Sequence, residues 1–152
     1  MNIYFYHTLI GKIGIAETGG SITNVFFEKD ILPQNVTEVE TPLIVEASQQ
    51  LDSYLMGKLQ HFTLPLSPVG TPFMQRVWVQ LCTIPYGETA TYKEIAVKTG
   101  NGKASRAIGL ANNRNPIPVF IPCHRVIGSN GTLTGYRGGL GVKKILLDLE
   151  RE

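Results

Sequence analysis

The sequence contains few of the residues that bind metal ions or form disulfides. Only two of its 152 residues are cysteines, Cys82 and Cys123, and only three are histidines, His7, His61 and His124. No Cys-x-x-Cys or His-x-x-x-His spacing occurs, so we expect no metal site and no dithiol redox pair. Because the first residues also lack the basic start of a secretory signal, we expect two reduced thiols in a cytoplasmic protein.

Long apolar runs are also absent. None approaches the ~20 residues that a transmembrane helix needs, so no membrane partner is expected. The glycine-rich residues 135–139 do not follow the Gly-x-x-x-x-Gly-Lys-Ser/Thr pattern of a P-loop, which argues against a nucleoside triphosphate site. With 43% hydrophobic and 17% charged residues, the composition is that of a globular chain large enough for one or two domains.

The positive charge is concentrated in the second half of the chain. Residues 1–70 carry three basic and seven acidic residues, a balance of −4, whereas residues 71–152 carry eleven basic and five acidic residues, a balance of +6. Between Lys93 and Lys144, nine basic residues are opposed only by Glu94. Such a concentration is typical of a surface that contacts phosphates, and an ordinary solvated basic face is the alternative.

The pattern predicts two domains, residues 1–68 and residues 69–152. Residues 2–29 alternate apolar and polar positions around several glycines, which predicts short antiparallel strands joined by hairpin turns. A helix is expected after Thr41-Pro42, where a capping hydroxyl precedes a proline in the first turn. Residues 60–70 contain two prolines and no helical period, so we expect them to form the linker.

The second domain is predicted to contain a pair of helices of a DNA-binding type. A first helix, after Thr71-Pro72, should place Trp78 and Cys82 in the core. Residues 92–98 and 103–113 then predict two helices around a short turn, a helix-turn-helix pattern. The later helix is expected to bury Ala104, Ala107, Ile108 and Ala111. Its outer face is expected to carry Lys103, Arg106, Gly109, Asn112 and Asn113.

A last helix is expected from Val142 to about Leu149, after a flexible loop at residues 135–139. Its buried stripe should consist of Val142, Ile145, Leu146 and Leu149. Glu150 stands at the carboxyl end, where the helix dipole disfavours a negative charge. Either a cationic or imidazole partner or simple solvation would account for this carboxylate.

Cys123 is the candidate nucleophile. It is followed by His124 and Arg125, so a thiol, an imidazole and a guanidinium occupy consecutive positions between hydrophobic residues. A lone cysteine is commonly a small buried hydrophobe, but an adjacent base and cation favour a reactive thiolate. Neighbouring side chains of an extended segment point to opposite sides, so we expect a water relay between His124 and the thiol, with Glu150 orienting the imidazole.

Residues 121–126, Ile-Pro-Cys-His-Arg-Val, preceded by Asn115-Pro116, resemble the active-site signature of the O6-alkylguanine-DNA alkyltransferases, also called methylated-DNA–protein-cysteine methyltransferases. The resemblance covers residues 71–152 and is highly specific, whereas over residues 1–70 only the α+β layout is similar. It extends through Pro85-Tyr86-Gly87-Glu88-Thr89, Tyr92, Arg106-Ala107-Ile108-Gly109, Gly135-Tyr136-Arg137-Gly138-Gly139-Leu140 and Leu146-Leu147-x-Leu149-Glu150.

This resemblance implies a fold and an activity. The implied fold is an α+β N-terminal domain, ribonuclease-H-like, with a small antiparallel sheet plus a helix, followed by a mainly α C-terminal domain with a helix-turn-helix and a wing. The implied activity is DNA repair, in which the alkyl group of O6-alkylguanine in double-stranded DNA is transferred directly to Cys123. Whether O4-alkylthymine is also repaired stays open. A thioether is not hydrolysed here, so each protein molecule is expected to act only once. The protein is expected to be a monomer and to need no cofactor.

The resemblance also implies roles for five catalytic residues. Cys123 would be the nucleophile and alkyl acceptor, His124 the base acting through water, and Glu150 the group that orients the imidazole. Asn115 would brace the active-site turn through hydrogen bonds. Tyr92 would donate a hydrogen bond to the guanine as negative charge builds on the departing base.

DNA contacts and a base pocket are implied as well. The second helix of the pair would enter the minor groove, and Arg106 would fill the gap left by the flipped nucleotide. The other expected DNA-binding residues are Ala104, Ala107, Gly109, Asn112, Thr91 and Arg125. The expected residues of the substrate pocket are Tyr136, Arg137, Gly138, Gly139, Val126 and Trp78. Arg137 sits at a variable position of the family, and a phosphate contact from it is a further hypothesis.

Two features depart from the family pattern. The cysteines that hold a structural zinc in the amino-terminal domain of some relatives are absent, and Gly102 stands where relatives often have proline.

Three other functions are alternatives to alkyl transfer. A non-catalytic alkyltransferase-like lesion-binding protein would lack the cysteine, and a cysteine hydrolase would turn over many times and need a distant histidine. A helix-turn-helix regulator would leave Cys123, His124 and Glu150 without a purpose.

Overall fold

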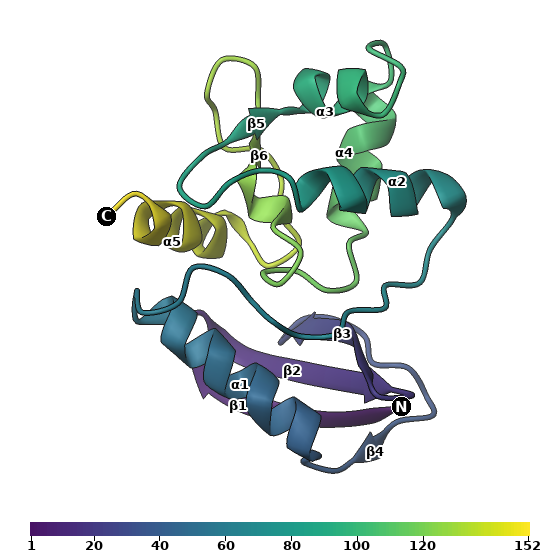
Figure 1. Ribbon diagram of the computed structural model, residues 1–152, viewed down its shortest axis with the longest axis vertical. Coiled ribbons are helices and arrows are strands. Elements are labelled where there is room, and N and C mark those ends of the chain that lie inside the picture. Colours follow the sequence, from purple (N-terminus) through teal and green to yellow (C-terminus); the bar gives the residue numbers. More distant parts are fainter. The chain divides into compact units, whose positions relative to one another are not determined.

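Three antiparallel strands at the start of the chain form a meander (Figure 1). They are β1 (Asn2–Thr8), β2 (Gly11–Thr18) and β3 (Ser21–Phe27), and a short β4 (Thr37–Glu38) pairs in parallel with β1 to give the order β3-β2-β1-β4. The turn between β2 and β3 uses Gly19 and Gly20, both at positive φ, as a tight hairpin requires. The computed structural model describes all residues 1–152, which divide into two compact units, 1–69 and 70–152.

One helix covers a face of this sheet (Figure 1). Helix α1 (Pro42–Leu55) starts at Thr41, whose hydroxyl accepts a hydrogen bond of 3.2 Å from the backbone of Ile44. Its buried side includes Ile44, Ala47, Leu51, Tyr54 and Leu55. These residues recur at the helical period and pack on the sheet, so the predicted α+β layout of the first unit is confirmed.

The second unit is mainly helical. It contains α2 (Pro72–Leu81), α3 (Tyr92–Lys98), α4 (Ser105–Asn113) and α5 (Leu140–Glu150), with two short parallel strands, β5 (Ala90–Thr91) and β6 (Val126–Ile127). Helices α3 and α4 pack together and against α2, and they form the predicted helix-turn-helix. At the start of α3, Thr91 and Glu94 satisfy each other's backbone N–H groups in a capping box, which fixes where this helix begins.

Several positions in the second unit, Asn112 among them, differ in burial from the sequence prediction. Helix α4 begins at Ser105, and its buried residues are Ile108, Ala111 and Asn112, so Ala107 is exposed and Ala104 only half-buried. Cys82, predicted in the core beside Trp78, is exposed because α2 ends one residue earlier. In α5, Ile145 is exposed and Val142 and Leu149 are only half-buried, which follows from the register of that helix.

Helix α5 buries a stripe of two apolar and two charged residues. The buried residues are Lys143, Leu146, Leu147 and Glu150, spaced i, i+3, i+4 and i+7. Because successive residues are rotated by about 100° around the helix axis, Ile145 falls outside this stripe and is 40% exposed. The stripe therefore delivers one ammonium group and one carboxylate to the interior of the unit.

Candidate functional site

Cys123 lies in a tight turn, and the extended conformation expected around it is wrong. Residues Cys123–Arg125 form the single turn of 3-10 helix η1, in which the N–H of Val126 donates to the carbonyl of Cys123. The chain is folded back just before it, since Ile121 N donates to Ile117 O at 2.9 Å and Val119 has a φ of 74°. The thiol is 4% exposed.

Two asparagines, Asn112 in the last turn of α4 and Asn115 just after the helix, hold the backbone on either side of the thiol. Asn115 donates from Nδ2 to the carbonyl of Ile121 at 2.9 Å and accepts from Ile117 N at 3.0 Å. Asn112 donates from Nδ2 to the carbonyl of Cys123 at 3.2 Å. Asn115 therefore lies where a bracing residue was predicted. The DNA-contact role predicted for Asn112 is wrong, because its side chain is 2% exposed and points inward.

Glu150 joins the imidazole and the guanidinium that follow Cys123. Its Oε2 lies 2.8 Å from His124 Nε2 and 3.0 Å from Arg125 Nη2, and its Oε1 lies 2.8 Å from Arg125 Nε. Arg125 also donates from Nη1 to the carbonyl of Ile84 at 2.8 Å. Arg125 was predicted to contact DNA, and this is wrong, because it is 8% exposed and its guanidinium is engaged by these groups.

Burial lowers the pKa of His124, while the hydrogen bond and the charge of Glu150 act in the opposite direction. The imidazole is therefore neutral in the resting protein. A carboxylate can only accept, so the proton of the neutral ring sits on Nε2 toward Glu150, and Nδ1 carries the lone pair. The pair is arranged as a base whose protonated form would be stabilised by the adjacent carboxylate.

Burial also raises the pKa of the Cys123 thiol. A hydrogen bond with Asn115, the charges of Arg137 and Lys143, and a hydrogen bond with Tyr136 oppose this rise. The thiol is thus protonated at rest, in surroundings that favour the thiolate once a base removes the proton.

Lys143 is a site residue that sequence reasoning missed. Its side chain is fully buried, and Nζ donates to the carbonyls of Val126 at 2.7 Å and Thr134 at 3.2 Å. Burial lowers the pKa of this ammonium group, and the Cys123 thiolate acts to raise it. The available signal was a lysine in phase with Leu146, Leu147 and Glu150, on the buried stripe of the last helix.

The loop before α5 supplies further groups around the thiol. Tyr92, at the start of α3, is hydrogen-bonded through its hydroxyl to the hydroxyl of Thr134. Arg137 donates from Nη2 to the carbonyl of Asn115 at 3.0 Å, and Tyr136 is 8% exposed. Gly139 has a φ of 95° and ends the loop directly before α5, while Gly138 is half-buried.

Two predicted pocket residues lie inside the packed core of the unit. Val126, in β6, is fully buried. Trp78 is 2% exposed, and its Nε1 donates to the carbonyl of Ala111 at 3.0 Å. The indole therefore supports the buried side of α4, in agreement with the core position predicted for Trp78. The additional role predicted for Trp78, in the substrate pocket, is wrong.

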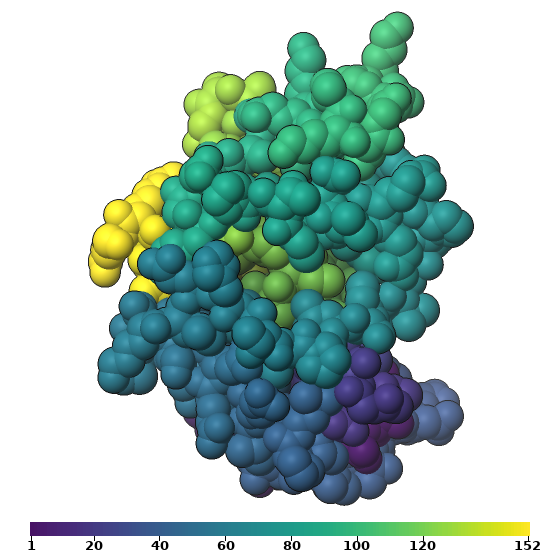
Figure 2. All heavy atoms as spheres, viewed as in Figure 1, coloured from purple at the N-terminus to yellow at the C-terminus, as the bar shows by residue number.

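The outer face of α4 lines an open groove. Its lining residues are Lys103, Ala104, Arg106, Ala107, Gly109, Leu110 and Asn113. Figure 2 shows atoms of the helix-turn-helix region, in green, projecting at the surface. The groove combines small side chains with two cations, and it contains four of the predicted DNA-binding residues. Thr91, another predicted DNA-binding residue, does not line this groove. It is half-buried, and its hydroxyl accepts a hydrogen bond of 3.1 Å from Glu94 N as the cap of α3.

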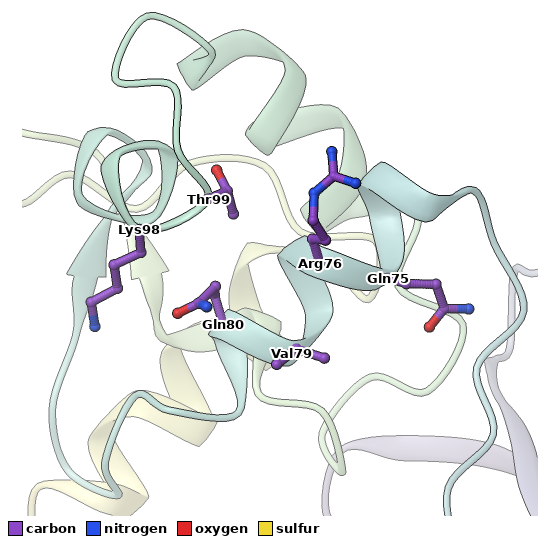
Figure 3. Close-up of a pocket in the computed structure, with 6 residues that line it drawn as sticks. All are labelled: Gln75, Arg76, Val79, Gln80, Lys98 and Thr99. Carbon is purple, nitrogen blue, oxygen red and sulfur yellow. The ribbon is translucent and has the colours of Figure 1, made fainter.

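A second groove lies between α2 and α3 (Figure 3). It is lined by Gln75, Arg76, Val79, Gln80, Lys98 and Thr99. No group of three or more cysteine, histidine, aspartate or glutamate side chains is placed to hold a metal ion. No helix is long and apolar enough to cross a membrane.

Comparison with known protein families assigns both units. Residues 2–68 match the family model described as the ribonuclease-like domain of 6-O-methylguanine DNA methyltransferase, and residues 72–152 match the DNA binding domain of the same protein.

Individual relatives carry names that agree with these family models. A protein of Bacillus subtilis named methylated-DNA–protein-cysteine methyltransferase, constitutive, is 46% identical over 99% of this chain and 96% of its own length. One of Methanosarcina barkeri named methylated-DNA–protein-cysteine methyltransferase is 63% identical over 69% of this chain and 66% of its own length. The crystal structure of Mycobacterium tuberculosis OGT in complex with DNA superposes with a TM-score of 0.93 at 43% identity, covering 99% of this chain and 93% of that one.

Proposed function

The chain belongs to the 6-O-methylguanine DNA methyltransferase family, and from this premise we propose that it repairs DNA by moving the alkyl group of O6-alkylguanine onto the sulfur of Cys123. It is a DNA-binding transferase, and the observation that carries the proposed site is the buried pairing of His124 with Glu150 next to that thiol. This pairing supplies what a protonated cysteine lacks, a base whose charged form is stabilised.

The transfer is a single displacement. The Cys123 proton passes through a water molecule to Nδ1 of His124, and the resulting imidazolium is held at 2.8 Å by Glu150. The thiolate attacks the alkyl carbon, a carbon–sulfur bond forms, and the carbon–oxygen bond breaks with its electron pair remaining on the guanine. Arg125 pairs with the same carboxylate through two hydrogen bonds of its own.

Tyr92 is proposed to stabilise the departing guanine. Its hydroxyl is hydrogen-bonded to that of Thr134, and with Thr134 as the donor of this bond the Tyr92 O–H is available to the base as negative charge develops. A pre-oriented donor in a site with little water is worth more than the same group in bulk solvent. Tyr136, Arg137, Gly138 and Gly139 belong to the loop proposed to enclose the flipped base.

The exposed side of α4 is proposed to meet DNA in the minor groove. Ala104, Ala107 and Gly109 present no bulk there, which permits close approach of the helix to the duplex. Arg106 is exposed on the same face and would occupy the space vacated by the extruded nucleotide. The basic excess of residues 71–152 favours the same surface for phosphate contacts.

The product is a thioether, which this site has no means of cleaving. One molecule therefore repairs one lesion, and no cofactor enters the balance of bonds. We assign residues 69–152 to the domain that performs this chemistry and residues 1–68 to a separate domain. Both cysteines are free thiols, which suits a reducing, cytoplasmic location.

Mass spectrometry of the protein mixed with duplex DNA containing O6-methylguanine tests the proposal. The expected result is one added methyl group on Cys123, stoichiometric with the protein and final. A Cys123→Ser variant should bind the duplex and gain no mass. Wild-type protein that binds the lesion but stays unmodified would instead support a lesion-binding role and refute transfer.

A further inference from the structure

We propose that Asn112 is a positioning residue for the nucleophile: its side-chain amide fixes the peptide that carries Cys123. The inference rests on the proposed alkyl transfer and extends it to a residue that was predicted on the outer face of α4 but is buried. The supporting geometry is a hydrogen bond from Asn112 Nδ2 to the carbonyl of Cys123 at 3.2 Å, within the interior of the second unit.

The backbone around the thiol is held from a single place. Asn115 donates to the carbonyl of Ile121, and Asn112 donates to the carbonyl of Cys123, so the carbonyls on both sides of the intervening Pro122 are fixed from the end of α4. Rotation of the Cys123 peptide would change the direction of its Cα–Cβ bond and hence the position of Sγ. An attack on carbon needs that sulfur aligned with the breaking bond.

The cost of placing an asparagine here argues for a role beyond filling space. Asn112 is 2% exposed, and its Oδ1 has no hydrogen-bond partner. A buried polar atom without a partner is destabilising, so an apolar side chain of similar volume would serve packing at least as well. What leucine could not supply is the N–H that reaches the carbonyl of Cys123.

The location of Asn112 also connects two parts of the proposed reaction. Helix α4 presents Arg106 and Ala107 on its exposed side and Asn112 on its buried side. The carbonyl of Ala111, one residue earlier, is bound by Trp78, which fixes the end of the helix against α2. The helix proposed to enter DNA therefore also carries the donor that sets the nucleophile.

The test compares Asn112→Leu and Asn112→Asp with wild type. Leucine removes both the donor and the unsatisfied oxygen, and aspartate keeps the shape but has no N–H donor and, when ionised, can only accept. Transfer should be measured from duplex O6-methylguanine DNA and from the free O6-alkylguanine base, together with duplex affinity and thermal stability. Thr23→Val is the matched control, since Thr23 is 8% exposed and its Oγ1 is also buried without a partner, but it lies in the first unit.

Both Asn112 variants should transfer about 10- to 100-fold more slowly, by the same factor from duplex and from free base, because the displaced atom is the sulfur. Duplex affinity should stay within about twofold, and Asn112→Leu should melt no lower than wild type. Thr23→Val should transfer at the wild-type rate. Reaction of Cys123 with iodoacetamide, measured for Asn112→Leu in a Cys82→Ser background, should keep its pH midpoint, because this variant adds no charge and positioning leaves the thiol's acidity unchanged.

Three results would overturn the inference: normal transfer by both variants, a loss confined to duplex substrate, or a loss that tracks a fall in melting temperature. The first would deny any role in alignment, the second would restore a DNA contact, and the third would reduce Asn112 to a packing residue. Failure of the proposed function can be distinguished from failure of this inference, because wild-type protein would then transfer no alkyl group from either substrate.

Discussion

The ammonium group of Lys143 donates a hydrogen bond of 2.7 Å to the carbonyl of Val126, three residues beyond the nucleophile. A second bond from the same group, to the carbonyl of Thr134, fixes the residue that orients Tyr92. One buried cation thus supports both the strand that follows Cys123 and the loop that supplies the leaving-group donor.

Lys143→Met keeps a long unbranched side chain and removes this charge. Because the cation acts to lower the pKa of the Cys123 thiol, we expect that pKa to rise and transfer at neutral pH to slow. The pH midpoint of Cys123 alkylation by iodoacetamide, in a Cys82→Ser background, measures the shift. Lys144→Met is the control, because Lys144 is exposed and pairs only with Asp148. An unchanged midpoint would remove Lys143 from thiolate stabilisation.

Glu150→Gln should damage both stability and transfer. The substitution leaves the buried Arg125 guanidinium without its anion, which typically costs about 3–5 kcal/mol in unfolding free energy. It also removes the anion that stabilises protonated His124, so transfer should fall by about 100-fold or more. Urea unfolding and single-turnover transfer measure the two effects. Asp148→Asn, at an exposed carboxylate of the same helix, should show neither; wild-type transfer by Glu150→Gln would contradict the assigned base.

The acid side of the stability profile should report His124. Its pKa is lowered by burial below the ordinary 6.5, so the unfolded chain binds a proton that the folded protein resists. Stability is therefore complete above pH 6.5 and declines as the pH falls below that value, by up to about 1.4 kcal/mol per pH unit. Urea unfolding of wild type and His124→Gln across this range measures the slope. His61→Gln, at an exposed residue, is the control, and an equal slope in His124→Gln would assign the effect elsewhere.

Tyr92→Phe should slow transfer without altering the thiol. The variant keeps the ring but loses the hydroxyl held by Thr134, so the departing guanine receives no hydrogen bond. A loss of about 100- to 1000-fold is typical for one oriented donor of this kind. Iodoacetamide reactivity of Cys123 should be unchanged, because that reaction has no guanine leaving group. A parallel loss in both reactions would mean that Tyr92 acts on the thiol instead.

Arg106→Ala should weaken transfer from duplex DNA more than transfer from the free alkylated base. Arg106 is exposed on the groove face of α4, so its loss affects extrusion of the nucleotide and not the displacement itself. Rates on the two substrates, at several salt concentrations, separate these steps. Arg76→Ala removes a cation from the groove between α2 and α3 (Figure 3) and should affect neither rate strongly. Equal losses on both substrates would exclude Arg106 from extrusion.

The sequence predicted the elements well where the signal is local. Thr41 and Thr71 cap helices as the two Thr-Pro pairs predict, because each hydroxyl accepts from an N–H three residues ahead. Thr91 caps α3 in the same way, although it was predicted only as a DNA contact. The reactive turn was harder to predict. Its shape depends on Val119 at positive φ and on hydrogen bonds from Asn115, none of which leaves a periodic signal.

The errors at polar residues have one physical cause. Asn112, Arg125 and Lys143 are polar or charged, and such residues are usually assigned to the surface. Each is buried because of a partner distant in sequence: the carbonyl of Cys123, the carboxylate of Glu150, and the carbonyls of Val126 and Thr134. Sequence alone shows that such residues are present, but only the fold brings their partners within reach.

The small exposure of Cys123 has a consequence for a molecule that acts only once. Any stray electrophile in the cell that reached the sulfur would consume the whole protein without mending a base. A thiol that stays protonated and almost covered until a large, specifically shaped partner arrives is shielded from such accidents. Slow reaction of Cys123 with small electrophiles would then preserve the thiol of a single-use protein until alkylated DNA is bound.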